Sequence, residues 1–251
     1  ALLRALAQEF RRSWPSVEIE VPDSVGSNGG IRALMSGQCE LARVARPLTD
    51  NELFNDLRCQ VFALTPVVFV VHRNVRGLAS LSQDLLLRVY SGRLRDWSEI
   101  GAEKSRVYVA NREKGDSSRD VLERELPAFA RIDKFAGRIL YNTLETVAVV
   151  NQFSGTIAYL PLSAAAPAER IRILEYEGIK VGEETVLAGE YPFVIPLGLV
   201  WQGEPSTLVA GFLCFLRGPT AAALMRANGA FPLPADSVNL QKLPLRQPLR
   251  D

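Results

Sequence analysis

The chain has 251 residues, of which 47% are hydrophobic and 23% charged, and its 29 basic and 28 acidic side chains give a formal net charge of +1. This composition is typical of a globular protein and excludes a disordered or fibrous one. The near balance of charge excludes the broad positive field that gathers nucleic acid or anionic membrane, so any anion site must be local. No apolar run reaches the ~20 residues of a membrane-spanning helix, so we expect no membrane insertion by this chain.

The first third of the chain predicts alternating helices and strands from the spacing of its apolar residues. We expect, in order, a helix over 2–15, a strand over 17–21, a helix that begins in the glycine-rich turn 26–30, a strand over 40–47, a helix over 49–57 and a long apolar strand over 61–72. Ser27 or Asn28 is expected to cap the second helix at its start, and Gly37 to cap it at its end.

The rest of the chain continues this alternation. We expect a helix over 80–92 capped at Ser80 or Ser82, a strand over 105–112, a helix after the turn 112–119, a helix over 143–155, strands over 156–162 and 171–179, an extended segment over 189–202, helices over 206–218 and 219–229, and an aperiodic tail over 236–251. The pattern predicts an α/β protein whose sheets are mostly parallel, with helices on both faces.

Two long apolar segments, 61–71 and 191–201, are expected to cross between two lobes. Lobe I would comprise residues 1–65 and 195–251, and lobe II, inserted in it, residues 66–194. We expect a cleft between the two lobes.

Two turns rich in glycine and serine carry the candidate chemistry: GSNGG at 26–30 and REKGDSSR at 112–119. A helix N-terminus has unpaired N–H groups and about half a positive charge, so such turns can cradle an anion. Taken singly, each turn is better explained as a capped helix, with Ser117 and Asp120 forming an approximate capping box. Each arginine alone is better explained as solvated or as the partner of a surface carboxylate. The presence of one turn in each lobe favours an anion site.

Several other kinds of site are excluded by the motifs. The chain has neither the G-x-G-x-x-G pattern of dinucleotide binding nor a P-loop. His72 is the only histidine, so we predict no zinc site and no Ser-His-Asp triad, and we expect no cofactor, no metal and no enzymatic activity. Cys39 and Cys59 are expected to be free thiols, although a bridge between them stays open.

The order of these segments resembles the phosphate-binding proteins of bacterial ABC transporters, over roughly residues 1–235. The resemblance is carried by GSNGGIRALMSGQCELARVARPLTDNEL, TPVVFVVHRN, SLSQDLLLRVYSGRLRDWSEIG, VANREKGDSSRDVLE, NQFSGTIAYLPL, GEYPFVIPLGLVWQG and FLCFLRGPTAAALMRANGAFPLP. It implies the two-lobed periplasmic binding-protein fold, closing by a hinge at two crossover strands onto a phosphate held by hydrogen bonds. It also implies a membrane permease as partner and export to the periplasm or another extracytoplasmic compartment, and we expect a monomer.

The resemblance implies roles for individual residues. Ser27 matches a phosphate-binding serine, Arg112 matches the arginine that pairs with the oxyanion, and Ser117 and Ser118 fall on the Gly and Thr of the family's G-S-G-T motif. Further candidates are Asn28, Arg46, Asp116 and Arg119.

Two departures from the family pattern weigh against this reading. Asp116 replaces the first serine of G-S-G-T, and Ala45 replaces the Asp or Ser that usually precedes Arg-Pro. A carboxylate repels phosphate unless it is turned away or a proton is shared between them. We therefore hypothesise that Asp116 accepts the phosphate proton, a role that a carboxylate near the position of Ala45 performs in relatives.

Two functions follow as expectations. The first is an exported solute-binding protein that captures a small oxyanion, with inorganic phosphate as first candidate, in the cleft between the lobes. The alternative is a sensor, adhesion or signalling module of the same fold with an altered anion site, which Ala45 and Asp116 favour.

Overall fold

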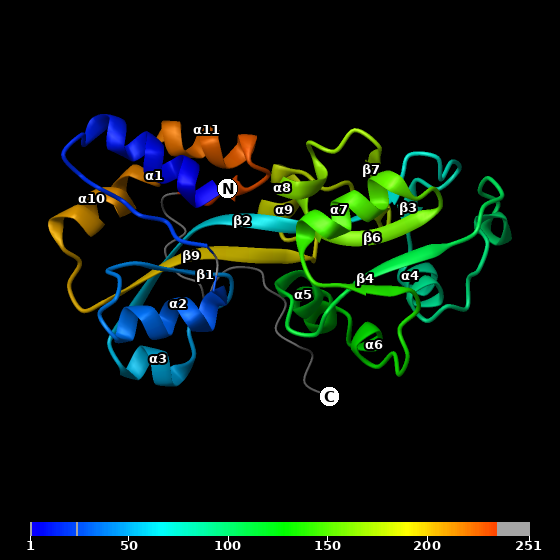
Figure 1. The fold of residues 1–251 in the computed structure, drawn as a ribbon, viewed down its shortest axis with the longest axis horizontal. Helices are drawn as coiled ribbons and strands as arrows, with labels where there is room; N and C mark the ends of the chain where they lie inside the picture. Colours follow the sequence, from blue (N-terminus) through cyan, green and yellow to red (C-terminus); the bar gives the residue numbers. More distant parts are fainter. Residues whose placement is uncertain (1, 24, 235–251) are drawn as a thin grey trace. The chain divides into compact units, whose positions relative to one another are not determined.

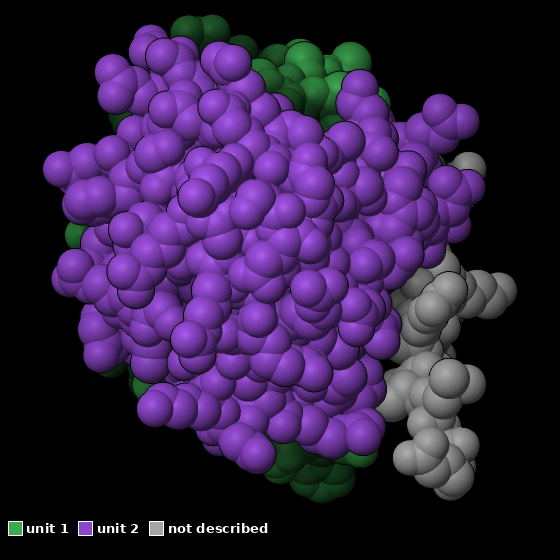
Figure 2. All heavy atoms as spheres, turned by 90° about the vertical axis from the view of Figure 1, so that its right-hand side faces the viewer, with its two compact units in different colours: residues 1–65, 196–243 green, residues 66–195, 244–251 purple. Residues whose placement is uncertain are grey.

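The computed structural model describes residues 2–23 and 25–234 (Figure 1). These residues form two compact units, coloured separately in Figure 2: unit 1 contains those up to residue 65 and from 196 onward, and unit 2 contains residues 66–195. The chain passes from one unit to the other within the strand β2 (Leu57–His72) and again within β9 (Val194–Gln202). The tail predicted for 236–251 lies outside the described residues.

Unit 1 combines helices with the first part of β2, up to residue 65, and with β9 from residue 196 onward. Its other elements are α1 (Leu2–Ser13), α2 (Gly26–Met35), β1 (Ala42–Val44), α3 (Asp50–Phe54), α10 (Thr207–Phe215), α11 (Pro219–Ala227) and β10 (Phe231–Pro232). β1 pairs antiparallel with β9, and β10 pairs antiparallel with β2. The fully buried Phe10 of α1 meets Phe212 of α10 edge to face, with ring centroids 5.2 Å apart, which fixes these two helices together.

Unit 2 is built on the second part of β2, residues 66–72. Its elements are β3 (Ser80–Leu81), α4 (Gln83–Tyr90), the 3-10 helix η1 (Trp97–Ile100), β4 (Tyr108–Arg112), α5 (Ser117–Glu125), α6 (Pro127–Ala130), β5 (Arg138–Leu140), α7 (Thr143–Gln152), β6 (Thr156–Pro161), α8 (Leu162–Ala165), β7 (Ile171–Ile173), β8 (Glu175–Tyr176) and α9 (Glu183–Leu187). β2 pairs antiparallel with β6 and β7, whereas β4 pairs in parallel with β5 and β6. The short strands β3 and β8 form a separate parallel pair.

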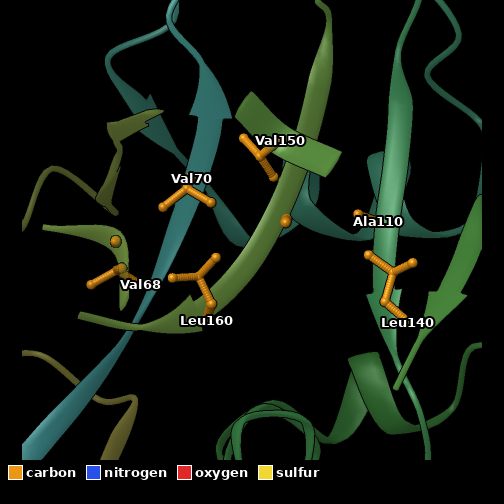
Figure 3. Close-up of a cluster of buried hydrophobic side chains, with 8 residues drawn as sticks. Val68, Val70, Ala110, Leu140, Val150 and Leu160 are labelled. Carbon is orange, nitrogen blue, oxygen red and sulfur yellow. The ribbon is translucent and has the colours of Figure 1, made fainter. Parts of the chain in front are cut away.

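Strand β2 is buried on both faces within unit 2, which explains its unbroken apolar sequence. Val68 and Val70 point to one face because alternate residues of a strand share a side. There they join Ala110, Leu140, Leu160 and the α7 residue Val150 in a core cluster (Figure 3). On strand β2 the intervening Phe69 meets the ring of Phe193 with centroids 5.4 Å apart. The core of unit 2 therefore lies around this strand, and β4, which leads into the anion turn, is fixed to it through β6.

The α/β class and most predicted helices and strands are confirmed, with ends that differ by a few residues. The expectation of mostly parallel sheets holds for β4 with β5 and β6 and for β3 with β8. It is wrong for β2, which pairs antiparallel with β6, β7 and β10, and for β9, which pairs antiparallel with β1. Short elements that the sequence did not predict are β3, β5, α8, α9 and β10.

The strand predicted over 17–21 is wrong, because the structure assigns no strand to this segment. Arginines of α1 bind its carbonyl groups instead of a neighbouring strand. Arg11 Nε donates to the Val17 carbonyl at 3.1 Å, and Arg4 Nε donates to the Val21 carbonyl at 3.0 Å. An alternating pattern predicts a strand only where a sheet edge is available to pair with it.

Within the described part of the chain, no single helix has the length and apolar composition of a membrane span. The pair α10 and α11 meets these criteria only when taken together, across a bend of 64°.

We predict that Leu160→Ala lowers the free energy of unfolding by about 2–5 kcal/mol, because it leaves a cavity beside Val68 and Val150 in the core of unit 2. Urea unfolding followed by circular dichroism measures this loss. Leu144→Ala on α7 is the matched control, since Leu144 is 82% exposed while Leu160 is 1% exposed. Equal effects of the two substitutions would contradict the placement of Leu160 in the core.

Candidate functional site

The first anion turn lies at the start of α2, which packs against β1 through Ile31 and Leu34. The helix is capped by Val25 without a side-chain hydrogen bond, so the prediction of Ser27 or Asn28 as cap is wrong. The chain enters the helix at Gly26 with φ of +73°, a conformation that glycine adopts without strain, and both polar residues fall inside the first turn. At the other end Ser36 is the cap, and Gly37 follows it with φ of +71°.

Ser27 binds back to the segment after β1. Its hydroxyl oxygen accepts a hydrogen bond from the backbone N–H of Ala45 at 2.9 Å. A hydroxyl that accepts keeps its own proton for donation. Ser27 is therefore fixed by the backbone of β1's exit and still has a donor to offer an anion.

Arg46 is already paired within unit 1. Its two terminal nitrogens donate to the two carboxylate oxygens of Glu52 at 2.9 and 2.8 Å, and one of them also donates to Asn28 Oδ1 at 2.7 Å. The bond from Arg46 lowers the pKa of Glu52 to about 2, helped by the backbone N–H of Thr49, and the same pairing raises the pKa of Arg46. The charge of Arg46 is thus matched by a carboxylate before any ligand is present.

The second anion turn lies between β4 and α5 in unit 2. Arg112, the last residue of β4, is only 5% exposed. One terminal nitrogen donates to Thr146 Oγ1 of α7 at 3.1 Å, and the other donates to Asp116 Oδ2 at 2.7 Å. Its backbone N–H donates to Asn111 Oδ1 and to the Tyr159 hydroxyl. Two side chains, Thr146 and Asp116, thus hold the guanidinium, and two others hold the backbone of the same residue.

Asp116 caps α5, which corrects the capping box expected from Ser117 and Asp120. Its Oδ1 accepts from the backbone N–H groups of Ser118 and Arg119 at 3.1 and 3.2 Å. Gly115 permits the turn before it, with φ of +87°. The carboxylate therefore binds the free N–H groups at the start of the helix and the guanidinium of Arg112 at the same time.

The remaining candidates of this turn differ in position. Ser117 is exposed, whereas Ser118 is 3% exposed and faces the interior. Arg119 is paired: its Nε donates to Glu123 Oε1 at 2.6 Å and one terminal nitrogen donates to the carbonyl of Arg112 at 2.9 Å. Its guanidinium also stacks over the ring of Phe135, 4.5 Å from the centroid.

The structure thus brings Ser27, Asn28 and Arg46 together in unit 1, and Arg112, Asp116, Ser118 and Arg119 together in unit 2. The partners that were not predicted from the sequence include Glu52 for Arg46, Thr146 for Arg112 and Glu123 for Arg119. Glu52 belongs to a capping box with Thr49, and the T-D-N-E pattern is a signal for it. Thr146 has no such signal, because it lies 34 residues from Arg112.

Other reactive groups lie apart from these turns. Cys39, Cys59 and Cys214 are free thiols, and burial raises the pKa of Cys59 to about 12. His72 is buried, and its Nδ1 accepts from the backbone N–H of Asn74 at 3.1 Å. Across residues 2–23 and 25–234, no group of three or more His, Cys, Asp or Glu side chains is placed to hold a metal ion.

Comparison with known proteins finds similarity to phosphate-binding proteins. The model of a family described as the PBP superfamily domain matches residues 1–219. The phosphate-binding protein PstS of Bacillus subtilis is 22% identical over 227 residues, which is 86% of this chain and 71% of that protein. PstS 2 of Streptococcus pneumoniae is 25% identical over 130 residues, 49% of this chain and 44% of that protein.

Solved structures show the same fold. A Clostridium perfringens protein, described as a candidate phosphate ABC transporter substrate-binding protein and solved with bound phosphate, has a TM-score of 0.79 and 21% identity, over 92% of this chain and 94% of that one. An ABC-type phosphate transport receptor from Vibrio cholerae has a TM-score of 0.71 and 19% identity, over 92% and 94% of the two chains.

The Arg46 and Glu52 pair predicts a pH dependence of stability. The folded pKa of Glu52, about 2, lies below its ordinary value, so the stabilisation is complete above about pH 5 and is lost as the pH falls toward 2. We expect Glu52→Gln to lower the free energy of unfolding at pH 7 by about 1–3 kcal/mol, and this difference from the wild type to shrink at acid pH.

Urea unfolding at several pH values measures the effect. Glu204→Gln is the control, because Glu204 also pairs with an arginine of unit 1, Arg58, but its side chain is 81% exposed. We expect that control to change stability by about 0.5 kcal/mol or less. A constant difference between wild type and Glu52→Gln from pH 7 to pH 3 would refute the prediction.

Proposed function

The chain belongs to the PBP superfamily, and we propose that it is a solute-binding protein that captures a small oxyanion, inorganic phosphate first of all, for uptake by an ABC transporter. The proposal includes a membrane permease as partner and an extracytoplasmic location. It is supported by the relatives above, which are phosphate-binding proteins by name, and by the fold shared with a protein solved with bound phosphate.

One observation in this chain carries the proposal: in the turn between β4 and α5, hydrogen-bond donors surround a negatively charged group of the chain itself, the Asp116 carboxylate. A buried guanidinium and two backbone N–H groups surround the Asp116 carboxylate within 2.7–3.2 Å. Carboxylate and phosphate oxygens both accept charge-assisted hydrogen bonds from arginine and from backbone N–H groups. A set of donors that holds one oxyanion is chemically suited to another.

The turn at the start of α2 supplies a second group of the same character. Ser27 is positioned by Ala45 and keeps a hydroxyl proton. The first turn of a helix of ten residues also carries partial positive charge. We propose that Ser27 donates to phosphate and that Arg46, which Glu52 neutralises, has a lesser part in binding.

A second candidate function is a sensor, adhesion or signalling module of the same fold. The observation that favours it is that both arginines of the turn 112–119 are matched by carboxylates, Arg112 by Asp116 and Arg119 by Glu123. Such a module would keep the fold with an altered anion site.

Isothermal titration calorimetry of the full chain with phosphate, and with sulfate as control, tests the proposal. We expect phosphate to bind and Ser27→Ala to weaken it about 10–100-fold, the value of a hydrogen bond to a charged group. Ser36→Ala at the other end of α2 is the matched control, since its hydroxyl donates to the Ala33 carbonyl. We expect that variant to bind as the wild type does.

The variants also separate the two functions. Phosphate binding that Ser27→Ala leaves unchanged would remove Ser27 from the site. If neither anion binds to a chain that unfolds cooperatively on heating, the uptake function is wrong and the second candidate gains support.

A further inference from the structure

We infer that Asp116 is an internal competitor for phosphate: its carboxylate occupies the anion position at the start of α5, and phosphate binds there only by displacing it. The inference rests on the proposed function and concerns the regulation of that same site. It differs from the role hypothesised from sequence, in which Asp116 accepts a proton from the bound phosphate.

The contacts of the two carboxylate oxygens carry the first step. Oδ2 accepts from Arg112, and Oδ1 accepts from the backbone N–H groups of Ser118 and Arg119. Arg112 was predicted to pair with a bound oxyanion, and N–H groups at the start of a helix are donors that suit one. The Asp116 carboxylate thus occupies the hydrogen-bond donors that phosphate would need. A residue that accepted a proton from phosphate would instead leave these donors to the phosphate and contact it from the side.

The surroundings of Arg112 carry the second step. Its guanidinium is 5% exposed and is also bound to Thr146, so it cannot swing out to meet a ligand while staying paired with Asp116. The Asp116 side chain is itself only 13% exposed. Gly115 before it has no side chain, and a Cβ added there would meet no atom within 4 Å, so this turn has room to rotate and release the carboxylate. Phosphate can therefore replace the Asp116 carboxylate, whereas there is too little space for both to contact Arg112 at once.

The local charge carries the third step. Residues 112–123 contain three basic side chains, Arg112, Lys114 and Arg119, against four acidic ones, Glu113, Asp116, Asp120 and Glu123, a net charge of 3 − 4 = −1. The pKa of Asp120 is raised by burial and by the neighbouring carboxylates of Glu123 and Asp116, which reflects this negative field. A phosphate that arrives beside an undisplaced Asp116 meets a like charge, and displacement removes that repulsion.

The test compares phosphate affinity in the full chain and in three variants by isothermal titration calorimetry near pH 7.5. Asp116→Ser and Asp116→Asn remove the competing charge and keep an oxygen that can cap α5. Asp120→Asn is the matched control, because it removes a carboxylate from the same helical turn without touching Arg112. We expect both Asp116 variants to bind phosphate at least about tenfold more tightly than the wild type, and Asp120→Asn within about threefold of it.

Each other outcome overturns the inference in a distinguishable way. If wild type binds phosphate and the Asp116 variants bind equally or more weakly, Asp116 is a ligand contact and the proposed function stands. If Asp120→Asn gains as much as Asp116→Asn, general charge rather than displacement is responsible. If none of the four proteins binds while all unfold cooperatively, the proposed function fails and the inference with it. Should Asp116→Ser not fold, the nearly isosteric Asp116→Asn decides.

Discussion

The burial of one guanidinium sets the arrangement of the candidate site in unit 2. Arginine keeps its proton under all ordinary conditions, and an unpaired charge inside a protein costs several kcal/mol. Arg112 is nevertheless placed at the end of β4 among side chains of α7 and α5. The positions of Thr146 and Asp116 follow from this requirement. If phosphate binds here as proposed, the same charge must be satisfied when the anion is absent, and the Asp116 carboxylate does so.

Unit 1 meets the same requirement in a more ordinary way. Arg46 is paired with Glu52, which is itself fixed by the capping box of α3. The two arginines differ in what their partners do besides neutralising charge. Glu52 stabilises a helix start that no ligand is proposed to use, whereas Asp116 uses the very N–H groups that an anion would need. The pairing of Arg46 therefore stabilises unit 1, whereas the pairing of Arg112 involves the groups that we propose for phosphate binding.

Local pattern predicted most of the elements, because periodicity is read within a few residues, but the caps predicted for α2 and α5 were wrong. The segment 17–21 shows where this fails: alternation without a pairing edge gives no strand, and arginines of α1 bind its carbonyls instead. The partners of charged side chains were equally out of reach. Whether Arg112 meets a ligand or Asp116 depends on a side-chain rotation within five residues, and its contact with Thr146 on how β4 and α7 pack. The sequence REKGDSSR is compatible with a turn whose donors are free for a ligand and with a turn whose donors are occupied by Asp116.

The two strands that run through both units have one more property. Pro66 in β2 and Pro196 in β9 stand at the boundary itself, and proline has no amide hydrogen to give to a ladder. Directly beside it, Val67 donates to the Phe193 carbonyl at 2.8 Å and accepts from the Tyr191 hydroxyl at 2.8 Å. The backbone of Val67, in unit 2, is thus fixed by two hydrogen bonds, whereas each strand lacks one N–H donor at the proline where it passes between the units. In a hydrogen-exchange experiment, the backbone at this boundary would open at a lower free-energy cost than the core of unit 2, which begins one residue after Pro66. The unit 1 part and the unit 2 part of each strand therefore need not unfold in a single cooperative step.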